Sequence, residues 1–184
     1  MLEAAEQQGR RRRRLTTVSL LVVAVSVGVA IFLPEAVSLA WHLTHGTRAD
    51  FRGVTMSVPL GWWAFERENS LIIQKMGHTL LGEPHAQDMI LRPLDLPGDS
   101  VADDEKLKAA KIAIQRGQGY AFIAERQFPV GQEDSYCDYF HKLDDNQNLR
   151  ITCDVPSLKL SVDFFGDASY APALERALGT IRRR

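Results

Sequence analysis

The sequence lacks the local motifs that mark common nucleotide-binding and hydrolytic sites. It has no glycine-rich dinucleotide fingerprint, no P-loop and no HExxH zinc motif, and none of its serines lies in a nucleophile elbow. Net charge is also nearly absent, at −1 over 184 residues. Binding to a phosphate backbone needs a clustered basic surface, so this balance argues against a nucleic-acid partner. We therefore expect no enzyme, no cofactor and no bound metal.

The near-zero net charge conceals an uneven distribution. The N-terminal tail, residues 1–14, is cationic, and the remaining chain holds 17 Lys and Arg against 21 Asp and Glu. The tail's positive charges are five consecutive arginines, Arg10, Arg11, Arg12, Arg13 and Arg14. They directly precede Leu15–Leu33, a run without any charge. At about 1.5 Å per residue that run is long enough to cross a bilayer. By the positive-inside rule, the tail is expected in the cytoplasm and the C-terminal part outside, as in a single-pass protein of a bacterial-type inner membrane.

Two alternatives remain open around this segment. Cleavage after Ala40 would make it a signal peptide, although the apolar region of a cleaved signal is usually only about 7–15 residues long. We favour a retained transmembrane or signal-anchor helix over residues 15–40. The chain after Pro34 either continues this helix or forms a short helix in the headgroup layer, with Trp41 as an interfacial anchor. Residues 41–52 are predicted to be an interfacial segment and polar linker, and residues 53–184 an extracytoplasmic domain.

The chain has only two cysteines, Cys137 and Cys153. They flank a predicted hairpin that turns at Asp144-Asp145-Asn146, so the two residues face each other on neighbouring strands. Directly opposed cysteines on antiparallel strands can reach disulfide distance, and the predicted extracytoplasmic side permits oxidation. We predict a structural disulfide; the alternative is two buried free thiols.

The rest of the domain alternates between strand and helix signals. A capped helix is expected from about Ser100 to Gly117, with Val101, Leu107, Ala110 and Ile114 on its buried face and Lys106, Lys108 and Lys111 nearer water. A second helix is expected to end the chain, with Arg182 to Arg184 at its negative end. This order predicts an α+β fold, an antiparallel sheet with helices packed on it. The expected strands are 53–59, 61–65, 71–75, 88–91, 120–128, 135–143, 149–155 and 158–164. The last is predicted to be half-buried, with Leu158, Leu160, Val162 and Phe164 on one face and Lys159, Ser161 and Asp163 on the other.

One stretch carries a resemblance to a known family. A strand from Gly53 runs into Pro59 and then Gly61-Trp62, and the chain closes with a long strand at Leu158–Phe164 and a helix. This pattern resembles the PsbP-like sandwich domains, which include PsbP, the Mog proteins and envelope proteins of the DcrB kind. The resemblance implies a non-catalytic domain that binds a partner, often as an accessory part of a membrane complex, with no shared catalytic residues.

Few side chains are candidates for a site. Trp62 and Trp63 are consecutive, so in a strand one enters the core while the other can be exposed to a partner. His78, Glu83, His85 and Asp88 cluster in and directly after a predicted loop over residues 77–87. Two weaker cation-site candidates are His42 with His45, and His141 with Asp138, Asp144 and Asp145.

These observations lead to one hypothesis and one alternative. The chain is predicted to be a bitopic membrane protein whose outer domain binds another membrane protein, as an accessory subunit of a complex. The alternative is a small-ligand or lipid-binding envelope domain that uses a cleft beside the 77–87 loop; an enzyme is less favoured.

Overall fold

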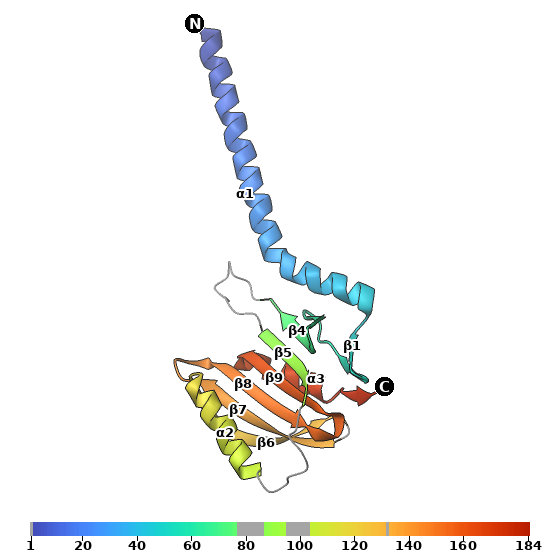
Figure 1. Ribbon diagram of the computed structural model, residues 1–184. Coiled ribbons are helices and arrows are strands. Elements are labelled where there is room, and N and C mark those ends of the chain that lie inside the picture. The colour runs from blue at the N-terminus through green and yellow to red at the C-terminus, as the bar shows by residue number, and fades with distance from the viewer. Residues whose placement is uncertain (1, 77–86, 95–103, 132) are drawn as a thin grey trace.

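The computed structural model describes residues 2–76, 87–94, 104–131 and 133–184. The chain begins with α1 (Leu2–His45), which projects from the sheet domain and approaches it only near its C-terminal end (Figure 1). The segments Thr17–Val29 and Phe32–His45 of this helix meet at an angle of 48°. Pro34 lies just after the bend. Its ring clashes with the carbonyl four residues earlier, at Ala30, which accounts for the bend at this position.

The helix predicted over residues 15–40 is therefore present, but it is bent and belongs to a longer helix. In the described part of the chain, no helix taken alone has the length and apolar character needed to cross a bilayer. The two segments on either side of the bend meet that criterion only as a pair.

The predicted α+β fold with a large antiparallel sheet is confirmed. The main sheet has seven strands in the order β3-β4-β5-β9-β8-β7-β6, and all neighbours pair antiparallel. A second sheet has the order β1-β2-β10. The main strands are β3 (Trp63–Arg67), β4 (Ser70–Lys75), β5 (Gln87–Pro93), β6 (Tyr120–Val130), β7 (Glu133–Lys142), β8 (Asp145–Val155) and β9 (Leu160–Asp167).

The small second sheet was not predicted, although its strand β2 falls within the expected strand 53–59. It consists of β1 (Arg48–Phe51), β2 (Val54–Ser57) and β10 (Arg182–Arg183). The prediction of a polar linker up to residue 52 is wrong for β1, because Ala49 and Phe51 are buried in the core. The prediction for Arg182–Arg184 is also wrong, because the first two pair with β2 instead of extending from a helix end.

Helices cover the two faces of the main sheet. Adjacent residues of β7 point to opposite faces, and they identify which helix covers each. Asp138 contacts Lys111 of α2 (Asp104–Gly117), whereas Tyr139 donates to Glu175 of α3 (Ala171–Leu178). Figure 1 shows α2 lying across the strands at the β6 end of the sheet. Short 3-10 turns, Pro156–Leu158 and Ala168–Tyr170, flank β9.

The hydrophobic core lies on the α3 face, between the main sheet, the small sheet and α3. Along β9 the alternation predicted from the sequence is confirmed for Leu160, Val162 and Phe164, which are fully buried. Asp163 was predicted to face water but is also buried, at 9% exposure, because it lies beneath the α2 face beside two arginines.

Candidate functional site

The end of α1 is bonded to the turn that leads into β3. The Oγ of Ser38 donates to the carbonyl of Trp62 over 2.9 Å, and this hydrogen bond is buried. A ring nitrogen of His42 lies 3.2 Å from the carbonyl oxygen of Pro59. Gly61 completes the turn with φ +84°, a conformation that glycine adopts without steric cost. These contacts make the segment Phe32–His45 part of the domain and not a flexible tether.

Trp41 also belongs to this junction. Its ring packs against the hydrophobic core and stacks on His45, with 5.1 Å between the ring centroids. The side chain predicted as an interfacial anchor thus contacts the domain. The large apolar side chains that this segment exposes are Phe32, Leu33, Leu39 and Leu43, at 68%, 48%, 61% and 78%.

The expectation that Trp62 and Trp63 point to opposite faces is confirmed. Trp62 is 3% exposed and meets Tyr170 edge to face, with the ring centroids 6.1 Å apart. Trp63 is half-buried on β3, opposite Gln74 of β4. Because Trp62 is enclosed, only Trp63 remains a candidate for contact with a partner.

Trp63 lies on a strand that ends the main sheet. No described strand pairs with the outer side of β3. Phe65 projects from the same face as Trp63 and is 38% exposed, and Leu60, in the turn before the strand, is 83% exposed. We call Leu60, Trp63 and Phe65 the apolar edge. Edge strands offer unpaired backbone groups to a partner, and exposed aromatic side chains add apolar contact area.

A second group of polar residues lies between α2 and the main sheet. The Nζ of Lys111 is 3.0 Å from a carboxylate oxygen of Asp138 and 3.2 Å from one of Asp154. Further along the same face, a guanidinium nitrogen of Arg150 lies 3.3 Å from the carboxylate of Asp163. In this polar layer the ion pairs of Lys111 hold α2 on the sheet, whereas the Arg150–Asp163 pair joins the neighbouring strands β8 and β9.

This layer overturns the predicted orientation of α2. Ile114, expected on the buried face, is 60% exposed, whereas Gln115 is 5% exposed. Ala110 is exposed as well, and Val101 and the side chain of Leu107 lie outside the described residues. Lys111 turns inward because two carboxylates of the sheet neutralise it. In the sequence, Lys111 lies within the otherwise apolar run Ala109-Ala110-Lys111-Ile112, which could have indicated an inward position. It was predicted instead to lie nearer water.

Only some of the histidine and carboxylate candidates lie in the described part of the chain. His78, Glu83 and His85 lie outside the described residues, and Asp88 accepts a hydrogen bond from Gln74 over 2.7 Å. Asp138 is held by Lys111, while His141 lies on the opposite face of β7 by strand alternation. Among the described residues no group of three potential metal ligands is present.

The predicted disulfide is present. Cys137 and Cys153 are directly paired between β7 and β8, with their Cα atoms 4.2 Å apart and an S–S bond. Both are 1% exposed. The bridge joins two neighbouring interior strands of the main sheet and has a structural role.

Tyr139, on the core face of β7, has a raised pKa. Burial raises its pKa from the ordinary value of 10.0 to about 12, with a further contribution from the carboxylate of Glu175, which accepts its hydroxyl hydrogen over 3.1 Å. The group is therefore a neutral hydrogen-bond donor at physiological pH.

This shift predicts a pH dependence of stability. The unfolded chain loses the phenol proton near pH 10 while the folded chain keeps it to about pH 12, so the stability linked to this group is complete below pH 10 and declines between these values. In a Tyr139→Phe variant that decline should be smaller. Urea midpoints measured below pH 10 and near pH 12 test this; an equal decline in both proteins would contradict it.

Comparisons with known proteins give no assignment for this geometry. No family model and no curated protein matches the chain. The similarity to the PsbP-like group therefore stays a prediction.

Proposed function

We propose that this chain is a non-catalytic, bitopic membrane protein whose outer domain binds another membrane protein as an accessory subunit of a complex. The observation that carries the proposal is the junction of α1 with the β3 turn, where Ser38 is bonded to the carbonyl of Trp62 in a buried setting. This bond joins the segment after the apolar run directly to the strand that bears the apolar edge.

The membrane part of the proposal rests on sequence and on the bent helix. Arginines 10–14 precede an uncharged run, an arrangement typical of a cytoplasmic tail followed by a span. Beyond the bend, Leu39 and Leu43 expose apolar side chains on the last part of α1. Apolar side chains on a helix that leaves the bilayer at an angle suit the headgroup boundary.

The partner part of the proposal rests on the apolar edge. A flexible linker would let the domain sample many heights above the membrane, whereas the Ser38 and His42 contacts hold β3 at a fixed distance from the span. Trp63 and Phe65 would then lie at the same height above the membrane in every molecule. Binding energy at protein interfaces concentrates in a few aromatic side chains, and these two fit that role. The PsbP-like similarity predicted from sequence points to the same class of protein.

A binding role for an anionic small molecule is the second candidate. The cleft predicted for a small ligand or lipid adjoins the 77–87 loop, of which residues 77–86 lie outside the described chain. A different pocket, on the small sheet, favours this candidate.

The test is purification of the tagged full-length protein from its native membranes in mild detergent, with mass spectrometry of the proteins that co-elute. We expect one membrane protein to co-purify at fixed stoichiometry. A Trp63→Ala/Phe65→Ala variant should retain at most roughly one-tenth of the amount of this partner that the wild type retains. Ile114→Ala is the matched control, because Ile114 is an exposed apolar residue on α2.

Two results would contradict the proposal. The wild-type protein could elute alone at monomer size, which removes the accessory-subunit role. The double variant could retain the partner as well as the Ile114→Ala control does, which removes the apolar edge as the contact surface.

A further inference from the structure

The outer face of the small sheet gathers arginine and hydroxyl side chains around one pocket. In β2, Val54 and Met56 point into the core, so Thr55 and Ser57 point outward. Arg48 of β1 is paired with Ser57, and Arg182 of β10 is paired with Thr55. Residues paired directly across antiparallel strands project from the same face, so these four side chains share the outer face. Two strands that are more than 130 positions apart in the chain thus supply the two arginines.

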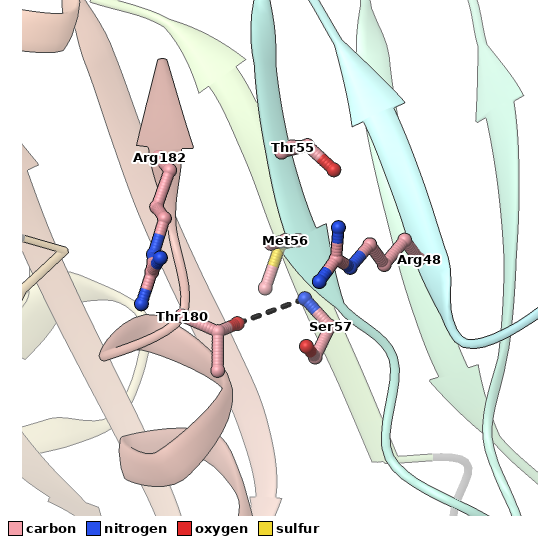
Figure 2. A pocket seen from close by; sticks show the side chains of 6 residues that line it. All are labelled: Arg48, Thr55, Met56, Ser57, Thr180 and Arg182. Atoms are coloured by element: carbon pink, nitrogen blue, oxygen red, sulfur yellow. Dashed lines mark hydrogen bonds between the residues drawn. The ribbon is translucent and has the colours of Figure 1, made fainter. Parts of the chain in front are cut away.

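These side chains line a pocket. The pocket measures about 180 Å³ and is lined by Arg48, Thr55, Met56, Ser57, Thr180 and Arg182. That volume is well above the roughly 15 Å³ that one water needs. Figure 2 shows the guanidinium groups of Arg48 and Arg182 on either side of the hydrogen bond between Thr180 and the backbone of Ser57. The pocket therefore has one guanidinium group on each side of that hydrogen bond.

The two pocket arginines differ from the other arginines of this region in lacking partners. Arg184 pairs with Asp50 at 3.4 Å, Arg183 donates to the carbonyl of Ser157, and Arg52 donates to Asn69. Within the described residues, the side chains of Arg48 and Arg182 make no ion pair and no hydrogen bond; only their backbones pair with β2. Two like charges that face one hollow repel each other, and an anion between them removes that repulsion.

The hydroxyl groups narrow the choice of anion. The Oγ1 of Thr180 already accepts from the backbone N–H of Ser57 and donates to the carbonyl of Ala177, so it shapes the pocket without donating into it. The hydroxyls of Thr55 and Ser57 have no such bonds in the described residues and can donate to a ligand. Two guanidinium forks plus two hydroxyls exceed what the two oxygens of a carboxylate can accept, whereas a phosphate monoester offers three oxygens.

We propose that this pocket binds the phosphate group of a phosphate monoester. Arg48 and Arg182 hold the oxygens as two opposed forks, and Thr55 and Ser57 donate the remaining hydrogen bonds. The phosphate belongs either to a soluble molecule or to a lipid headgroup. Arg48 follows the end of α1 at His45 by three residues, which places the pocket beside the segment that leaves the proposed span. Only the lipid source rests on the proposed membrane anchor; phosphate binding does not.

The experiment uses the full chain in nanodiscs of phosphatidylcholine, titrated calorimetrically with inorganic phosphate against chloride at equal ionic strength. We expect saturable phosphate binding that acetate does not reproduce. An Arg48→Gln/Arg182→Gln variant should bind roughly tenfold more weakly for each arginine removed. Arg184→Gln is the matched control, since Arg184 lies on the same strand end but pairs with Asp50 and does not line the pocket. Its affinity should equal that of the wild type.

A second arm separates the two sources of phosphate. Nanodiscs doped with phosphatidate, a lipid monoester, should abolish the titration by inorganic phosphate if the headgroup fills the pocket; an unchanged titration assigns the site to a soluble ligand. Three results would overturn the site itself: no binding beyond chloride, equal binding of acetate, or equal losses in Arg184→Gln and in the double variant. Equal urea midpoints for all variants establish that these differences do not arise from unfolding. Loss of the accessory partner leaves all of these outcomes unchanged, so the two proposals fail separately.

Discussion

A Trp62→Ala variant should lose about 3–5 kcal/mol of the free energy of unfolding, the usual cost of truncating a fully buried tryptophan. Trp62 is 3% exposed, packs against Tyr170 and belongs to the core. Its carbonyl also accepts the buried hydrogen bond from Ser38, so a collapse around the cavity disturbs the junction with α1. The effect should therefore combine lost packing with a loosened helix attachment.

Trp63→Ala is the matched control for this prediction. Trp63 has the same side chain one position later but is only half-buried, so its removal should cost clearly less. Pulse proteolysis of both variants and the wild type across a urea series measures the difference without relying on tryptophan fluorescence. Equal shifts of the urea midpoint in the two variants would contradict the assignment of Trp62 to the core and Trp63 to the edge.

Replacing both cysteines with alanine should lower the free energy of unfolding by about 3 kcal/mol on the chain-entropy estimate. The bridge spans a sequence separation of 16 residues and so restricts the unfolded chain. It also ties β7 to β8, two neighbouring interior strands of the seven-stranded sheet. Loss of the bridge should shift the whole unfolding transition, because the core on one face and the polar layer on the other both depend on these strands.

Reductant supplies the control for the disulfide. The wild-type protein unfolded in urea with reductant should approach the midpoint of the Cys137→Ala/Cys153→Ala variant, whereas reductant should leave the variant unchanged. A wild-type midpoint that is the same with and without reductant, while the variant is destabilised, would assign the effect to lost packing and not to the bridge.

The features predicted correctly are those set by neighbouring residues. The alternation along Leu160–Phe164 is decided by a period of two, and the pairing of Cys137 with Cys153 follows from a turn centred between them. The separation of Trp62 from Trp63 follows from strand geometry alone. In each case the information lies within one strand or one hairpin, so a sequence pattern is sufficient.

The features missed depend on residues far apart in the chain. The rotation of α2 is set by Asp138 and Asp154, which lie 27 and 43 positions after Lys111, and an amphipathic pattern does not contain those partners. The strand Arg48–Phe51 is short and begins with a charge, so it resembles a linker until β2 pairs with it. The phosphate pocket was missed for the same reason, because the pairing of β10 with β2 joins the two ends of the domain.

We propose that α1 crosses a membrane and presents the sheet domain on the far side. This topology is tested by protease treatment of intact bacterial spheroplasts that express the full chain with different peptide tags at its two ends. External protease should remove the C-terminal tag, while the N-terminal tag survives on a protected fragment until the membrane is lysed. Survival of the C-terminal tag in sealed spheroplasts, together with its loss on lysis, would place the domain inside and contradict the proposed topology.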